Sequence, residues 1–167
     1  MTRLFLLRHA KAKWAEPGSR DYDRALDETG KADAAKVALA MQSAGYLPEL
    51  VLCSGAKRAR ETWEAASGPL GAVDIRYMDG LYSSDAGGYL DIIREAGNVE
   101  SVLVIGHNPM LEDLALALSR KGQSAAMAAV ARGFPTSGVA ALRFTTPFAE
   151  IAPVDGYLED FLTPAGQ

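Results

Sequence analysis

The chain has 167 residues, of which 49% are hydrophobic and 23% are charged, and its formal net charge is −4. These values are ordinary for a globular protein, and the length predicts one domain over residues 1–167 with a substantial core. The negative charge argues against a general nucleic-acid binder, since such proteins usually carry a clustered basic face. The apolar runs fall short of the ~18 residues of a membrane span, and the N-terminus lacks a signal-peptide pattern. We therefore expect a cytoplasmic protein that contacts neither nucleic acid nor membrane.

The first two thirds of the chain alternate between short apolar runs and helical patterns. Continuous apolar runs predict strands over residues 3–7, 50–53 and 101–105, and a weaker one over residues 73–78. Helical spacing predicts helices over residues 26–46, 56–67, 86–97 and 110–121. The expected helix-end residues are Thr29, Ser54 and Asp85 as N-terminal caps, Pro109 at a first helical position, and Gly45 at a C-terminal end.

The pattern weakens after Gly122. Residues 124–133 suit either a helix or a loop, and residues 138–144 and 150–160 predict late strands, antiparallel and near a sheet edge. The strand-helix alternation along the rest of the chain predicts an α/β fold. We expect a three-layer α/β/α sandwich whose central sheet is mostly parallel and is covered by helices on both faces.

Cysteine and histidine are scarce in this chain. The one cysteine, Cys53, excludes an internal disulfide, and its place at the end of an apolar run predicts a small core residue. The two histidines, His9 and His107, have no third companion at metal-ligand spacing. No glycine-rich nucleotide loop occurs in a strand-helix context. We therefore expect neither a metal nor a cofactor.

Both histidines come directly after apolar runs, in "RLFLLRHAKAKW" and "SVLVIGHNP". Ligands of open α/β sheets bind beyond the carboxyl ends of the strands. These ends carry Arg8 with His9, Ser54 with Arg58 on the following helix, and His107. Two guanidiniums there would bind a tetrahedral phosphate. A neutral imidazole among them can attack phosphorus and form a phosphohistidine, which water then hydrolyses.

These motifs resemble the histidine phosphatase superfamily. The family's N-terminal Arg-His-Gly is "RHA" here, with Ala10 in the place of the glycine. "SGAKRARET" matches its Ser-x-x-x-Arg-x-x-x-Thr at Ser54, Arg58 and Thr62, and "VIGHNP" matches its second histidine block. "DYDRALDETG" and the tail "FLTP" are similar to the SixA-type phosphohistidine phosphatases. The likeness covers most of the chain and is weakest over residues 122–145.

The resemblance implies a histidine phosphatase-like fold and a role for each matched residue. His9 would be the nucleophile, Arg8 and Arg58 would clamp the phosphate, and His107 would hydrogen-bond the phosphoryl oxygens. Ser54 would help to hold the phosphate or its loop. These five residues are our candidate catalytic and phosphate-binding site.

The proton donor for the leaving group stays open. Many larger relatives carry an acidic residue in an insertion, and the candidates here are Glu16, Asp21, Asp79 and Asp85. A missing acid matters less for phosphohistidine, because its imidazole departs more readily than an alkoxide.

For several charged and aromatic residues near the matched motifs we expect a structural or solvent-exposed role instead of a catalytic one. We expect Lys11 and Lys13 at the pocket rim and an Asp23–Arg24 pair fixing the first loop. Trp14 and Trp63 would pack, although Trp14 also stands where it can touch a substrate, and Arg60 would face away from the pocket.

Together these patterns predict a metal-independent phosphatase whose foremost substrate is phosphohistidine on a partner protein. Two alternatives remain, a phosphatase for a small phosphoester such as a sugar phosphate or nucleotide, and a non-catalytic phosphate-binding module. A phosphomutase is disfavoured because no evident insertion would enclose an intermediate between two transfers.

Overall fold

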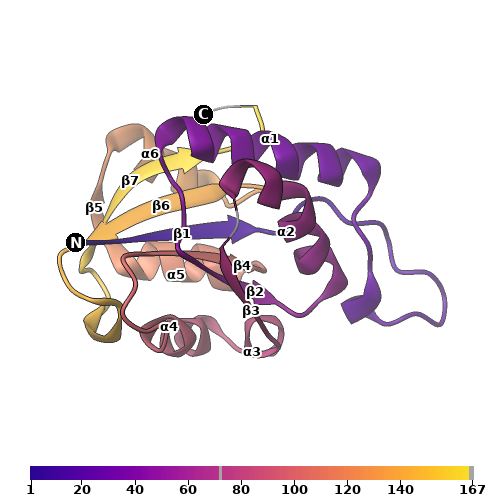
Figure 1. Ribbon diagram of the computed structural model, residues 1–167, viewed down its shortest axis with the longest axis horizontal. Helices are drawn as coiled ribbons and strands as arrows, with labels where there is room; N and C mark the ends of the chain where they lie inside the picture. The colour runs from indigo at the N-terminus through magenta and orange to yellow at the C-terminus, as the bar shows by residue number, and fades with distance from the viewer. Residues whose placement is uncertain (72, 166–167) are drawn as a thin grey trace.

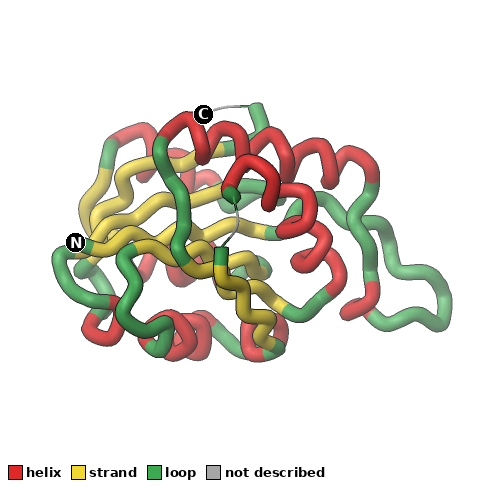
Figure 2. Tube along the Cα trace, in the orientation of Figure 1, coloured by secondary structure: helices red, strands yellow, loops and turns green. Residues whose placement is uncertain are grey.

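The computed structural model describes residues 1–71 and 73–165, which form one mixed sheet between layers of helices (Figures 1 and 2). The strands are β1 (Thr2–Arg8), β2 (Leu50–Ser54), β3 (Asp74–Met78), β4 (Ser101–Gly106), β5 (Ser119–Gly122), β6 (Val139–Phe144) and β7 (Gly156–Leu162). The helices are α1 (Glu28–Ala44), α2 (Lys57–Leu70), α3 (Gly80–Ser83), α4 (Ala86–Arg94), α5 (Met110–Leu118) and α6 (Ser124–Arg132), with 3-10 turns η1 (Asp21–Asp23) and η2 (Phe148–Glu150).

The strands lie in the order β3-β2-β4-β1-β6-β7-β5. β1, β2, β3 and β4 pair in parallel, β5 is parallel to β7, and β6 is antiparallel to β1 and β7. The predicted mostly parallel sheet is therefore confirmed. Arg8 pairs with Gly106, and Cys53 pairs with Ile105, so β1, β4 and β2 end at the same edge of the sheet. The motifs at these three strand ends are thereby brought together.

The pleat of β1 explains why the sheet carries helices on both faces. Leu4 and Leu6 belong to an apolar cluster with residues of α4, α5 and α6, whereas Phe5 and Leu7 belong to a cluster with α1 and α2. None of the four side chains is more than 1% exposed. Full burial of such a side chain is worth about 1.5–3 kcal/mol, so neither face can be left open to water. Figure 1 shows α1 and α2 on one side of β1 and α4 on the other.

Cys53 is fully buried in the second of these clusters, which confirms the prediction of a core residue. Burial raises the pKa of its thiol to about 12, so the sulfur stays protonated at neutral pH. None of the described helices combines the length and the apolar character needed to cross a membrane.

The helix ends agree with the sequence in part. Asp85 caps α4 by accepting a hydrogen bond from the backbone N–H of Gly88, and Gly45 ends α1 with φ 78°, both as predicted. The prediction for Thr29 is wrong, because Asp27 caps α1 instead. The carboxylate of Asp27 accepts from the backbone N–H of Gly30 at 2.7 Å, so the cap of α1 lies two residues earlier than predicted. Asp27 retains an extended backbone, as a cap requires, whereas Thr29 already lies inside the helix.

The end of the chain differs most from expectation. Residues 124–132 form α6, and the last strand begins only at Gly156, so the prediction of a strand from residue 150 is wrong over its first half. β6 is antiparallel as predicted but lies inside the sheet between β1 and β7. The edge on this side of the sheet belongs to β5, whose residues 119–121 continue the helical pattern of α5 and were predicted as helix. Pro109 likewise precedes α5 as its N-cap residue and is not the first helical position.

Candidate active site

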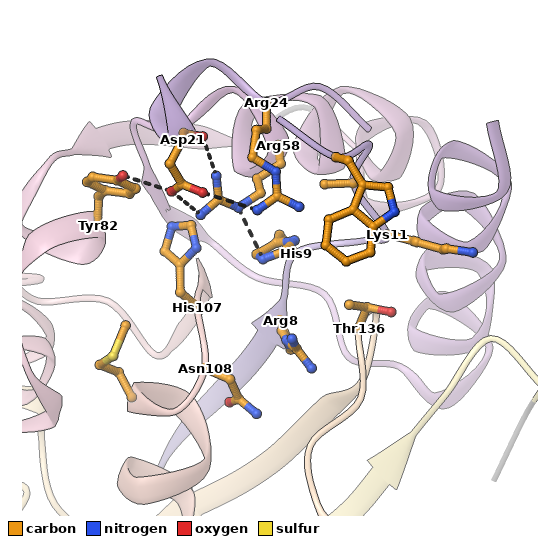
Figure 3. A pocket seen from close by; sticks show the side chains of 13 residues that line it. Arg8, His9, Lys11, Asp21, Arg24, Arg58, Tyr82, His107, Asn108 and Thr136 are labelled. Carbon is orange, nitrogen blue, oxygen red and sulfur yellow. Dashed lines mark hydrogen bonds and ion pairs between the residues drawn. The ribbon is translucent and has the colours of Figure 1, made fainter. Parts of the chain in front are cut away.

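A pocket of about 520 Å³ opens at the carboxyl ends of β1 and β4 (Figure 3). It is lined by Arg8, His9, Lys11, Ala12, Trp14, Asp21, Arg24, Arg58, Tyr82, His107, Asn108, Met110 and Thr136. Four of the five candidate site residues therefore face one cavity. Ser54 does not line the pocket but contacts His107 from the interior.

The ring contacts of His9 define its tautomer. Nδ1 lies 2.7 Å from the carbonyl oxygen of Ala10, which can only accept, so Nδ1 carries the proton. Nε2 therefore keeps its lone pair, and Nε of Arg58 donates to it at 3.3 Å. Burial, with a smaller effect of the nearby guanidiniums of Arg58 and Arg8, lowers the pKa of His9 to about 4. At neutral pH the ring is uncharged, and its Nε2 carries a lone pair on the side of Arg58.

The spacing of the second motif is explained by Thr62. Its hydroxyl donates to the carbonyl of Arg58 one helical turn earlier, at 2.7 Å, and accepts from the backbone N–H of Ala10 at 3.0 Å. Thr62 thus fastens α2 to the residue that follows His9. The methyl group of Ala10 is fully buried against Leu26 and Ala34, so the alanine that replaces the family's glycine fills a small apolar gap.

His107 is held from two sides. Its Nε2 lies 2.8 Å from the hydroxyl of Ser54, and its backbone N–H donates to the hydroxyl of Tyr89 at 3.1 Å. Burial and then the neighbouring His9 lower the pKa of His107 to about 3. The two imidazole rings lie 5.1 Å apart between centroids. A second neutral ring therefore stands beside His9.

Ser54 has a different local role from the one predicted. Its hydroxyl accepts from the backbone N–H of Ala56, but α2 begins at Lys57 with Ala56 as its N-cap residue. Ser54 ends β2, two residues before the N-cap position, so its hydroxyl shapes the turn between β2 and α2 and orients the ring of His107.

The two predicted clamps are positioned by backbone oxygens. One terminal nitrogen of Arg58 donates to the carbonyl of Asp21 at 2.8 Å, and one of Arg8 donates to the carbonyl of Phe134 at 2.9 Å. Nε of Arg8 is buried and has no hydrogen-bond partner within residues 1–71 and 73–165. A buried donor without a partner at a pocket wall is suited to an anionic ligand.

Asp21 is the carboxylate among the described residues that line this pocket, and its contacts favour the ionised form. It accepts from a terminal nitrogen of Arg58 at 3.0 Å, from Arg24 at 3.1 Å and from the hydroxyl of Tyr82 at 2.9 Å. Burial acts to raise the pKa of Asp21, but the hydrogen bonds from Tyr82, Arg24 and Arg58 prevail and hold it at about 2. Asp21 is therefore ionised at neutral pH and orients the arginines (Figure 3).

The other three acidic candidates lie elsewhere. Asp79 accepts from the hydroxyl of Tyr22 at 2.6 Å, Asp85 caps α4, and Glu16 lines a separate hollow beside Trp14. None of the described residues groups into a set of three His, Cys, Asp or Glu side chains that could hold a metal ion.

The family model of the histidine phosphatase superfamily (branch 1) matches residues 4–98. This chain belongs to that superfamily. A Mycobacterium tuberculosis protein is 35% identical over 161 residues, 95% of this chain and 99% of the relative. A chloroplastic protein of Arabidopsis thaliana is 36% identical over 128 residues, which are 70% of this chain but 59% of that longer protein.

The structure of a candidate phosphohistidine phosphatase SixA from Agrobacterium tumefaciens is also similar. It has a TM-score of 0.84 and 40% identity, and the likeness covers 98% of each chain. The predicted superfamily, its SixA-type branch and the phosphatase class are confirmed by these matches.

The pocket of this histidine phosphatase is also lined by residues that the sequence did not place there. Lys11 lines the pocket as a rim residue, whereas Arg24, Tyr82, Asn108 and Thr136 were not assigned to it. These four residues share no sequence motif, because they come from four separate segments: the first loop, α3, and the stretches after β4 and after α6. Only the packing of those segments around β1 brings them together.

Two local predictions near the pocket are corrected by the contacts. Asp23 does not pair with Arg24, because Arg20 pairs with Asp23 at 2.9 Å while Arg24 reaches the pocket carboxylate, Asp21. Trp14 does not pack, since it is 91% exposed at the pocket wall.

Lys13 was also expected at the pocket rim but lines the separate hollow that contains Glu16. Two other expectations near the site hold. Trp63 is buried against the sheet, and Arg60 turns away from the pocket as predicted. The guanidinium of Arg60 instead lies 4.1 Å from the centre of the Tyr77 ring.

Proposed function

We propose that this histidine phosphatase removes phosphate from phosphohistidine on a partner protein, through a covalent intermediate on His9. The observation that carries the proposal is the uncharged imidazole of His9, whose Nε2 lone pair lies beside the guanidinium of Arg58 and 5.1 Å, ring to ring, from His107. A neutral nitrogen nucleophile among fixed cationic donors suits attack on a phosphoryl group.

The charge around the pocket favours a doubly negative group. Arg8, Lys11, Arg24 and Arg58 line it against one carboxylate, Asp21. A phosphoryl dianion balances much of this excess positive charge. Guanidinium forks bond two phosphoryl oxygens at once, which fixes the phosphorus in front of Nε2 as well as binding it.

The first chemical step transfers the phosphoryl group to His9. Nε2 forms a bond to phosphorus while the bond from phosphorus to the substrate's ring nitrogen breaks, and the electron pair of that bond stays on the leaving nitrogen. The N–H at Nδ1 continues to donate its hydrogen bond to the carbonyl of Ala10, and this bond stabilises the positive charge that develops on the ring. Arg8, Arg58 and His107 stabilise the charge on the phosphoryl oxygens.

The second step regenerates the enzyme. A water molecule attacks phosphorus, the bond to Nε2 of His9 breaks, and inorganic phosphate leaves while the water's proton passes to solvent. His9 returns to the neutral tautomer with its proton on Nδ1. Two displacements replace one, each with an imidazole as a good nucleophile or leaving group.

The ionised state of Asp21 supports phosphohistidine as the substrate. An alkoxide leaving group needs a proton from an acid, whereas the only carboxyl group among the described pocket-lining residues has a pKa of about 2. A substrate imidazole that already carries a proton on its other ring nitrogen leaves as a neutral molecule. It needs no proton at the breaking bond.

The test compares phosphate release from a histidine-phosphorylated protein, p-nitrophenyl phosphate and a sugar phosphate, with wild-type protein and His9→Asn. We expect the highest kcat/KM for the phosphohistidine protein and no turnover by His9→Asn. A strong preference for either small ester would contradict the proposal in favour of a small-molecule phosphatase. Wild-type protein that binds orthovanadate but releases no phosphate from any substrate would instead be a binding module.

A further inference from the structure

We propose that Glu112 is a positioning residue that holds Arg8 in its phosphate-binding orientation through the backbone of Phe134. Oε1 of Glu112 accepts from the backbone N–H of Phe134 at 2.9 Å. The carbonyl oxygen of Phe134 accepts from a terminal nitrogen of Arg8, also at 2.9 Å. The inference rests on the proposed role of Arg8 in phosphate binding.

Arg8 is tied to the 133–138 segment by its backbone as well as its side chain. Its N–H donates to the carbonyl of Gly138 at 3.1 Å, and its carbonyl accepts from the N–H of Ser137 at 3.0 Å. Ser137 is fully buried and has φ 61°, a conformation that few non-glycine residues adopt. Because this segment supports Arg8 at three points, a shift of the segment shifts the clamp.

Asn108, just before α5, and Glu112, in its first turn, hold the segment at Phe134. The side-chain amide of Asn108 donates to the carbonyl of Phe134 at 3.0 Å, and the amide oxygen of Asn108 accepts from the backbone N–H of Glu112 at 3.2 Å. The Phe134 ring is 2% exposed and packs edge-on against Phe161, with centroids 5.0 Å apart. Both polar ends of Phe134 and its ring are therefore held, and Glu112 makes the contact to the N–H.

Glu112 also acts on Arg8 by its charge. Burial lowers the pKa of Arg8, and the carboxylate of Glu112 works against that shift by favouring the charged guanidinium. Glu112 could act on Arg8 by orienting it through Phe134 or only by its negative charge, and these two roles predict different effects of substitution. Two conservative substitutions separate these possibilities.

Glu112→Gln keeps the length of the side chain and an oxygen acceptor but removes the charge. Glu112→Asp keeps the charge but shortens the side chain by one methylene, so the bond to the N–H of Phe134 is lost. We expect Glu112→Asp to weaken orthovanadate binding and raise KM about tenfold, whereas Glu112→Gln stays within about threefold of wild type. Asp113→Asn, an exposed carboxylate on the same turn, is the matched control and should resemble wild type.

Orthovanadate affinity is measured by calorimetry, KM and kcat with the phosphohistidine protein, and folding by thermal unfolding of each variant. Glu112→Asp with wild-type vanadate affinity would overturn the inference. So would Glu112→Gln that binds vanadate as weakly as Glu112→Asp, because charge would then be the cause. Vanadate affinity is independent of turnover, so a wild-type protein without phosphatase activity contradicts the proposed function alone.

Discussion

Acidification from pH 7 to pH 5 should destabilise the fold through two side chains. The pKa values of His9 and His107 are about 4 and about 3 in the folded protein, against an ordinary value of 6.5. The unfolded chain therefore binds two protons between pH 6.5 and pH 5 that the folded chain excludes, so the free energy of unfolding falls as the pH falls. Each proton contributes about 1.4 kcal/mol per pH unit, or about 2 kcal/mol per imidazole at pH 5.

The expected loss is about 4 kcal/mol in all, a large part of the ~5–15 kcal/mol by which domains are stable. These are the only two histidines in the chain, so we assign the pH dependence of stability between pH 7 and pH 5 to them. Asp21, whose pKa is lowered from 3.8 to about 2, contributes stability that is lost only below pH 4.

Urea unfolding, followed by circular dichroism at pH 7, 6 and 5, measures the effect. His9→Asn and His107→Asn should each halve the pH dependence, and the double variant should abolish it between pH 7 and pH 5. Equal wild-type stability at pH 7 and pH 5, or a double variant that keeps the full slope, would refute the assignment of two buried neutral imidazoles.

Three further substitutions test contacts around the pocket. Asp21→Asn should lower kcat/KM about tenfold without moving the acid limb of the rate profile, because it loosens Arg58 and donates no proton; a shifted acid limb would make Asp21 an acid. Thr62→Val leaves the buried N–H of Ala10 unpaired and should cost about 1–3 kcal/mol of unfolding free energy, while an unchanged urea midpoint would contradict this account of the motif. Trp14→Ala should raise KM for the phosphohistidine protein and leave phosphoramidate, a small substrate, unaffected; equal effects on both would place Trp14 in the pocket's structure instead of its contact with the partner.

The parts of the site that the sequence predicted share a physical origin. His9 and His107 stand directly after buried strands, and such strands are visible as apolar runs. Once the strands are parallel neighbours, their ends must meet, so the two rings lie together. Arg58 and Thr62 were identified through their match to the family's Ser-x-x-x-Arg-x-x-x-Thr pattern. One helical turn separates them, and they contact His9 and Ala10, the two residues that follow β1.

The rest of the site depends on long-range contacts. Phe134 reaches Arg8 across 126 positions of the chain, and Asp21 reaches Tyr82 across 61. Neither pair can be predicted from a local sequence pattern. Any residue type supplies a backbone carbonyl, and an exposed tyrosine can serve many different roles. β5 was missed for another reason, since its residues extend the helical spacing of α5 and only pairing with β7 makes them a strand.

The nucleophile is identified most directly by locating the phosphoryl group during turnover. Wild-type enzyme is mixed with a labelled histidine-phosphorylated protein, stopped rapidly in alkali, in which phosphohistidine survives, and mapped by mass spectrometry. A phosphoryl group on His9, absent from His9→Asn, is the predicted result. A label on His107 or on any other residue, or full turnover by His9→Asn, would contradict the account.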